Sequence, residues 1–419
     1  MKIGHIISIL IGTTFVLTSN AALAADKTRL DSLVDEALNN NPQIFGSRSS
    51  WEAEKYKITQ SRSLPDPTAH YGYYGESVET RVGPMKHKVG ASQKIPFPAK
   101  LVVQGRSQKK SAEIFKEEYE ATERELIKNV KLVYYDIYWV DKAIQTTEGE
   151  KAILESLERV AKKRYESKLA PLQDVIKTQV AISELIEKLY TLNENRKSFV
   201  SQMNSLLNRD RNSSFDNVVN LNTSEFNHSL KDLSGMAGIS RQELKGAKIA
   251  IEKAQNERTL AKLNYVPDFT FGFDYTFIDK GNIAVQNNGK DAWLGTVSLN
   301  IPIWLNKINA QVKEKKAVLQ AAKENYVDTK NRVEYEVESL YYRINSGKDV
   351  INLYKNALIP QAQQSFDAAK VGYESGEVDF LNWLDSERTL LQVRLTYYKA
   401  VADYQKSIAQ MERVVGEDL

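Results

Sequence analysis

The chain has 419 residues, of which 42% are hydrophobic and 26% are charged, so its composition is that of a folded protein rather than a disordered one. Its 57 basic and 54 acidic residues nearly balance at a net charge of +3, which gives no electrostatic reason to expect a nucleic-acid partner. Cysteine is absent, and this excludes thiol catalysis, thiolate metal sites and disulfides.

The first 24 residues are predicted to be an export signal. Lys2 supplies the positive start, an apolar segment runs over 6–17, and small residues provide a cleavage site after Ala24. The apolar segment is too short for a comfortable transmembrane helix, and no later apolar run reaches about 18 residues. We therefore expect an exported chain with neither a lipid-modified cysteine nor a membrane-spanning helix.

The rest of the chain repeats one plan. A Pro-Asp step at 65–66 returns at 267–268, an Ile-Pro step at 95–96 returns at 301–302, and Tyr-Glu-Ser at 165–167 returns at 373–375. Three matches in the same order and at similar offsets predict an internal duplication. The first repeat is expected over 25–207 and the second over 240–419, with a polar linker at 208–239.

Each repeat begins with a helix and a β-hairpin. In the first repeat the helix is expected from Leu30 to about 61 and the hairpin at about 68–95. In the second, the helix is expected at about 240–264 and the hairpin at about 269–301. Pro96 and Pro302 stand where the last strand of each hairpin ends, a position that suits the change from strand to helix.

A long helical hairpin completes each repeat, at about 101–207 and about 305–415. Apolar residues from Leu126 onward recur with alternating spacings of four and three, which is typical of a coiled coil. A helix over 101–163 would be on the order of 90 Å long. A helix of that length is expected to pack against other long helices rather than inside a compact domain.

One predicted strand alternates strictly between aromatic residues and small or polar ones. Its aromatic positions are Phe269, Phe271, Phe273, Tyr275 and Phe277. An aromatic face opposite a polar face suits a strand with lipid on one side and water on the other. Ordinary periplasmic hairpins packed on a core remain an alternative. If the strands do span a bilayer, four are too few to close a barrel, so several chains must contribute to one.

These motifs resemble the TolC family of outer-membrane factors over nearly the whole mature chain. The resemblance rests on the duplicated plan, on the segments around the two Ile-Pro steps, and on the paired Tyr-Glu-Ser turns. It implies a mainly α fold with a β-hairpin in each half, and a homotrimer whose 12-stranded barrel in outer-membrane lipid continues into a periplasmic α-barrel. The segment "SQKIPFPAKL" also resembles the heavy-metal efflux branch.

The function implied by the resemblance is a passive outer-membrane exit duct of a tripartite efflux or type I secretion system. Its partners would be a periplasmic adaptor and an inner-membrane pump of the RND or ABC type, and its cargo small molecules or metal ions. The alternative is a periplasmic adaptor with a coiled coil and no channel, but an adaptor would carry one helical hairpin flanked by β-rich modules. A soluble coiled-coil scaffold would gain nothing from an exposed aromatic strand.

The resemblance places the Tyr-Glu-Ser turns at the periplasmic tip, where an adaptor docks and the channel closes. Adaptor contacts are therefore expected from Ser167, Lys168, Leu169 and Ala170, and from Ser375, Gly376, Glu377 and Val378. Lys168 stands where the family often has glycine, so the first turn is expected to differ from the second in geometry or in its adaptor match.

The same resemblance assigns a gate beyond the turns. Asp385 and Asn382 are expected to face inward, where three copies of Asp385 would form a negative ring that attracts cations. Asn382 departs from the family's carboxylate and is expected to weaken that ring. In the first repeat, Asp174 is the acid that matches Asn382 and is a further candidate for the gate. Arg388 is a candidate partner that would hold Asp385 in a closed entrance. Solvated helix faces are the plain alternative for both acids.

No enzyme is predicted. Phosphate-binding glycine loops, H-E-x-x-H and G-x-S-x-G are all missing from the sequence, and no cofactor is expected. His70 and His87 fall on the two strands of the first predicted hairpin, and a metal site there is an open alternative to ordinary lumen or interface side chains.

Overall fold

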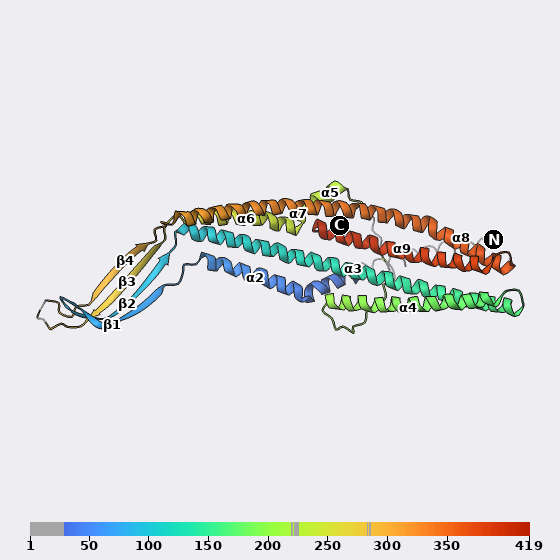
Figure 1. The fold of residues 1–419 in the computed structure, drawn as a ribbon, viewed down its shortest axis with the longest axis horizontal. Helices are drawn as coiled ribbons and strands as arrows, with labels where there is room; N and C mark the ends of the chain where they lie inside the picture. The colour runs from blue at the N-terminus through green and yellow to red at the C-terminus, as the bar shows by residue number, and fades with distance from the viewer. Residues whose placement is uncertain (1–28, 219–220, 222–225, 283, 285) are drawn as a thin grey trace, which may run out of the picture. The chain divides into compact units, whose positions relative to one another are not determined.

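The computed structural model describes residues 29–218, 221, 226–282, 284 and 286–419. These residues form two compact units, which are drawn in Figure 1. One unit comprises the described parts of 1–46, 120–241 and 331–419, and the other comprises 47–119 with the described parts of 242–330. Each unit therefore takes segments from both sequence repeats. The predicted export signal lies outside the described residues.

The second unit contains one antiparallel sheet in the order β1-β2-β3-β4. Its strands are β1 (Thr68–Thr80), β2 (Gly83–Ile95), β3 (Phe269–Ile278) and β4 (Ala292–Leu299). The two predicted hairpins are both present, and pairing of β2 with β3 joins them into a single sheet (Figure 1). Strands β1 and β4 are the two edges, and neither has a second partner strand among the described residues.

The sheet has one aromatic face and one polar face, as the alternation in the sequence predicts. The five aromatic residues of β3 pair across the sheet with Ile95, Gln93, Ala91, Val89 and His87 of β2. On the opposite face Asp274 Oδ1 lies 2.6 Å from His70 Nε2 and 3.2 Å from Lys88 Nζ. Since His70 pairs with Gly90 while His87 pairs with Tyr73, the two histidines lie on opposite faces and do not form a joint metal site.

Asp268, the residue before β3, ties the end of β2 to the start of the next helix. Its Oδ1 accepts hydrogen bonds from Lys100 Nζ at 2.7 Å and from the Phe97 backbone N–H at 3.0 Å. Both Asp268 and Lys100 are buried. The contact fixes the chain immediately after Pro96, where strand gives way to helix α3 (Pro98–Glu166).

Replacing Asp268 by alanine would leave the Lys100 ammonium buried without its partner. We expect the free energy of unfolding to fall by about 3 kcal/mol, because a buried charge that loses its counter-ion is strongly destabilising. Asp66, the exposed aspartate at the matching step of the first repeat, is the control, and Asp66→Ala should cost less than about 0.5 kcal/mol. Urea unfolding followed by circular dichroism measures both, and equal losses would contradict this role of Asp268.

The helices of each repeat largely follow the prediction, with one break. The helix expected from Leu30 to about 61 is two helices, one at 29–40 and α2 (Pro42–Arg62). Proline disfavours a helical conformation at the residue before it, and the Asn41 side chain instead accepts a hydrogen bond from the Gln43 backbone N–H at 2.9 Å. The matching helix of the second repeat is α6 (Gln242–Leu263). Helix α5 (Leu230–Ser240) lies in the region predicted to be a linker.

Two long helical hairpins are present. The first consists of α3 and α4 (Leu172–Leu206). The second consists of α7 (Leu305–Leu353), a five-residue π-helix (Tyr354–Leu358), α8 (Ile359–Ser375) and α9 (Phe380–Val415). Pro360 has no N–H to donate to the fourth residue before it, and this accounts for the wider turn immediately upstream. Among the described helices, none is both long enough and apolar enough to cross a membrane.

Candidate functional site

The two Tyr-Glu-Ser turns have the same backbone conformation. Gly376 ends α8 with φ of 86°, and Lys168 adopts the left-handed region at the matching position with φ of 60°. In the first turn Leu169 N–H donates to Arg164 O at 2.8 Å, and in the second Glu377 N–H donates to Gly372 O at 2.8 Å. Of the two expectations for Lys168, a different turn geometry is therefore wrong, while a different adaptor match stays a prediction. The hydrogen bonds that close the turn hold a lysine in a conformation that ordinarily favours glycine.

The two turns lie together at one end of their unit (Figure 1). Arg164, in the last turn of α3, donates from Nη1 to the carbonyl oxygens of Tyr373 at 2.8 Å and Glu374 at 3.1 Å. Its guanidinium carbon also lies 4.9 Å from the centre of the Tyr373 ring. The Arg164 side chain of one hairpin therefore donates to carbonyl groups at the end of α8 in the other.

A second contact joins the turns beneath the surface. The Tyr373 hydroxyl donates to Asp174 Oδ2 at 3.3 Å, and the two residues are only 4% and 9% exposed. Burial raises the pKa of the Asp174 carboxyl above its ordinary value, an effect that the hydrogen bond from Tyr373 opposes. Burial and the nearby Asp174 charge raise the pKa of Tyr373 to about 12, so its hydroxyl remains a donor across the physiological range. Asp174 is thus a buried contact between hairpins and not a solvated acid.

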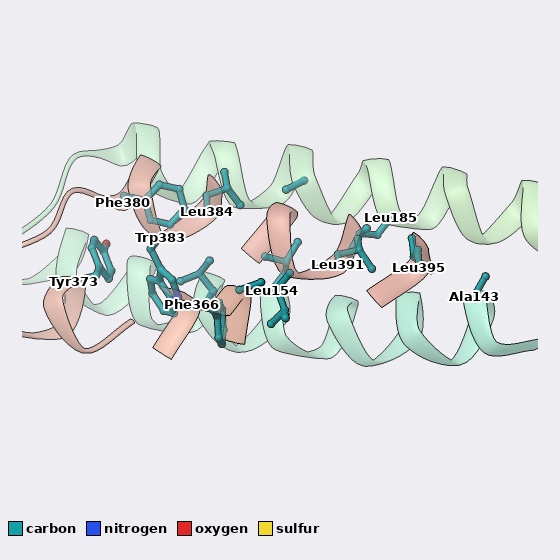
Figure 2. Close-up of a cluster of buried hydrophobic side chains, with 14 of the residues drawn as sticks. Ala143, Leu154, Leu185, Phe366, Tyr373, Phe380, Trp383, Leu384, Leu391 and Leu395 are labelled. Carbon is teal, nitrogen blue, oxygen red and sulfur yellow. The ribbon is translucent and has the colours of Figure 1, made fainter. Parts of the chain in front are cut away.

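The turns rest on a core that draws from both hairpins. Tyr373 and Phe366 of α8 pack with Phe380, Trp383 and Leu384 of α9, while α3 and α4 contribute Leu154 and Leu185 (Figure 2). The Tyr373 ring lies 5.1 Å from Trp383 and 5.6 Å from Phe380 between ring centres. This aromatic packing fixes the position of the hydroxyl that contacts Asp174.

The other predicted gate residues lie on the outside of α9. Asn382 and Asp385 are exposed, one helical turn apart, on the side opposite the core residues Trp383 and Leu384. The sequence suggested Asp385 as the partner of Arg388. In the structure Arg388 pairs instead with Glu184 of α4, at 2.9 Å between Nη2 and Oε2. Asp385 and Arg388 are one helical turn apart on α9, so helix geometry alone does not decide the pairing; the neighbouring α4 brings Glu184 within reach of the Arg388 guanidinium.

The predicted adaptor-contact residues cover the outer surface of the turns. Ser167, Lys168, Leu169, Ser375, Gly376 and Glu377 are exposed, while Ala170 and Val378 are half-buried. Val378 packs against Gly372, where an added Cβ would come within 2.4 Å of the valine Cγ2. The exposed residues form a surface with one basic, one acidic and one large apolar side chain.

Sequence reasoning missed four residues that connect the hairpins. Arg164 and Tyr373 belong to the repeated motif itself, but the motif gives no indication that one tyrosine is buried while its counterpart Tyr165 is exposed. The other two, Glu150 and Glu387, are fully buried acids that stand on the apolar seams of α3 and α9. An acidic residue at a position where the coiled-coil spacing calls for an apolar one could have indicated a buried acid from the sequence alone. Among the described residues, no three His, Asp or Glu side chains are arranged to hold a metal ion.

Two substitutions at the Tyr373–Asp174 contact should change the free energy of unfolding at pH 7 in opposite directions. Tyr373→Phe removes the hydrogen bond and leaves the buried carboxylate without its donor. This should lower the free energy of unfolding by about 1 kcal/mol at pH 7. Asp174→Asn retains an acceptor but removes the buried charge. Because the folded-state pKa of Asp174 is raised, its contribution to stability is complete below its ordinary value of 3.8 and declines as the pH rises through the folded-state value.

The asparagine variant should therefore be more stable than the natural chain at pH 7, and this advantage should disappear toward pH 3. Thermal unfolding at several pH values measures the difference. A loss of stability at pH 7 in both variants would contradict this account of the contact.

Comparison with known proteins agrees with this architecture. The sequence profile of the family "Outer membrane efflux protein" matches residues 33–209 and 233–417. The chain is 21% identical over 402 residues to the outer membrane protein TolC of Vibrio cholerae, covering 92% of this chain and 90% of that one. It is 34% identical to the cobalt-zinc-cadmium resistance protein CzcC of Cupriavidus metallidurans, but over only 62 residues, or 15% of each chain. The outer membrane protein VceC of Vibrio cholerae has the same fold, with a TM-score of 0.79 at 17% identity over 93% of this chain and 97% of that one.

Proposed function

The chain belongs to the outer membrane efflux protein family, whose members are channels and not enzymes, and from this premise we propose that it is a passive exit duct in the outer membrane. It would form one segment of a tripartite efflux or type I secretion system. The duct supplies a path, while a pump elsewhere supplies the energy and selects the cargo.

The observation that carries this proposal is the four-stranded sheet with two free edges. Its aromatic face is exposed, with Trp293 of β4 at 72% and Phe273 of β3 at 52%. Such a face suits lipid, but the N–H and C=O groups along β1 and β4 need partners in hydrocarbon, where water supplies none. Four strands are too few to close a barrel around a passage. Strands from other copies of the chain would satisfy both edges.

Three copies would contribute twelve strands and six helical hairpins. In this arrangement the strands form a barrel in outer-membrane lipid, and the hairpins surround a periplasmic passage. The α3–α4 and α8–α9 turns would form its entrance and contact a periplasmic adaptor, which in turn binds an inner-membrane pump of the RND or ABC type. The predicted export signal over residues 1–24 is consistent with this destination.

The cargo is proposed to be small molecules or metal ions. The local similarity to CzcC supports the metal-ion class. The proposal gives the chain no metal site of its own, since a passive duct need not bind what passes through it.

Cysteine pairs test the closure of the sheet between copies, because the natural chain has no cysteine to interfere. Val297 of β4 is replaced by cysteine and combined in turn with cysteines at successive positions of β1. We expect disulfides between chains at one set of alternating β1 positions, seen as crosslinked dimers and trimers on denaturing gels. Cysteines at Val297 and Phe271, which pair within the sheet, form the control for an intrachain crosslink. Absence of interchain crosslinks at every β1 position would contradict the barrel.

The proposed gate makes a second prediction. Asp385→Ala should lower the preference for cations, measured as the reversal potential across planar bilayers under a salt gradient, because it removes three negative charges from the entrance. The matched variant Asn382→Asp adds three charges on the same exposed stripe and should raise that preference. Identical reversal potentials in all three proteins would refute a gate at this stripe.

A further inference from the structure

A pair of acidic side chains is buried between the two helical hairpins. Glu150 of α3 and Glu387 of α9 are each 1% exposed. Glu150 occupies a seam position between Thr147 and Leu154, and Glu387 occupies one between Leu384 and Leu391. The pair therefore places two acids in a largely apolar interface, a few helical turns from the Tyr373–Asp174 contact.

The carboxyl oxygens of this pair lack ordinary partners. Both oxygens of Glu150 and Oε1 of Glu387 are enclosed without a hydrogen-bond partner among the described residues. Two carboxylates offer only acceptors and repel each other, whereas a proton bound between two neighbouring carboxyl groups supplies the missing donor. Burial raises the pKa of both groups, and for Glu387 the adjacent Glu150 adds to this and raises it to about 9. At least one proton therefore remains on the pair at neutral pH.

The charged groups around the pair do not replace that proton. Lys188 of α4 and Arg388 and Arg394 of α9 face it. Arg388 is paired with Glu184, and Arg394 Nη2 donates to Gln363 of α8 at 2.7 Å. Burial lowers the pKa of Lys188, although the nearby Glu387 opposes the shift. These basic groups favour ionisation of the pair, but their effect is smaller than that of burial.

A hollow connects this region with the surface. Its volume is about 250 Å³, and it is lined by residues of α3, α4 and α9 that include Leu154, Lys188 and Glu387. Because Lys188 and Arg388 also line it, the hollow does not favour a metal cation in place of the proton. It does give water a route to the carboxyl groups once the helices move apart.

We propose that Glu150 and Glu387 share a proton that fastens α9 to α3, and that separation of the two helical hairpins at this end releases it. The closed arrangement binds more protons than the separated one, since hydrated carboxyl groups ionise near their ordinary value of 4.5. Separation therefore becomes easier as the pH rises from about 4.5 to about 9. For one released proton, the ratio of separated to closed molecules should rise by up to about tenfold per pH unit.

The shared proton rests on the proposed function in one respect only, namely that separation of the hairpins would open the entrance of the duct. The shared proton can be tested without that assumption. Infrared spectra of the full chain should contain the C=O stretching band of a protonated carboxyl group at pH 7, and the band should disappear in the Glu150→Gln/Glu387→Gln double variant. Absence of the band from the natural protein at pH 7 would overturn the proposal even if the variant fails to fold.

The separation is tested by spin labels on the two turns. Ser167 and Glu377 are exposed and are replaced by cysteine in the otherwise cysteine-free chain, which is diluted with unlabelled protein so that each assembly carries one labelled copy. Between pH 6 and pH 8.5 the population of long distances should grow in the natural background and stay constant in the double glutamine variant. Glu158→Gln, which changes an exposed contact between α3 and Gln179 of α4, should keep the natural pH dependence.

An equal pH dependence in the double glutamine variant would overturn the proposal. A channel that fails to form would appear instead as a missing trimer with the infrared band intact, so the two failures are distinguishable.

Discussion

The two edges of the four-stranded sheet, which have no partner strand among the described residues, are the constraint on which the rest of the account depends. In water an exposed edge strand can bond to solvent, but in hydrocarbon each free N–H or C=O costs several kcal/mol. Strands β1 and β4 both carry such groups, while an exposed aromatic face makes the sheet unsuited to water. The duplication of the sequence thus produces a unit that is complete as a sheet but incomplete as a barrel.

The long helices, unlike the edge strands, need no other chain to pair their backbone groups. Helices α3, α4 and α9 satisfy their own backbone groups and need only a seam to pack along, which the alternating four-and-three spacing provides. The polar residues that interrupt the seams are then the places where packing is not set by apolar burial alone. Tyr373 with Asp174 and Glu150 with Glu387 are both of this kind, and both connect the first hairpin to the second. Contacts that depend on protons and hydrogen bonds are easier to change than apolar ones, which would suit the entrance proposed at this end.

Much of the fold was predictable, because the spacing of apolar and aromatic residues along the sequence indicates strands and helices directly. The aromatic alternation at 269–277, the Ile-Pro steps and the heptad-like spacing each correspond to one element, and the order of elements followed from the repeat. The break at Asn41 was missed although the Asn-Pro step indicates it. Joining of the two hairpins through β2 and β3 was not predictable, because pairing between strands some 180 residues apart leaves no local pattern.

The candidate site was less accessible to sequence reasoning. Repeat symmetry identified both turns, but it also suggested that equivalent residues behave alike. Tyr165 is exposed while Tyr373 is buried, and Lys168 adopts the conformation of Gly376 without being glycine. Arg388 was assigned to the wrong carboxylate, since the neighbouring α4 that carries Glu184 is not visible from the sequence of α9. Such contacts between hairpins depend on tertiary packing.

The number of chains in the membrane-extracted assembly tests the central claim most directly. Native mass spectrometry of the full-length protein, released from detergent, should give a mass of three chains, the number proposed to close twelve strands into one barrel. A folded protein that is extracted from the outer membrane with the mass of a single chain would contradict the account.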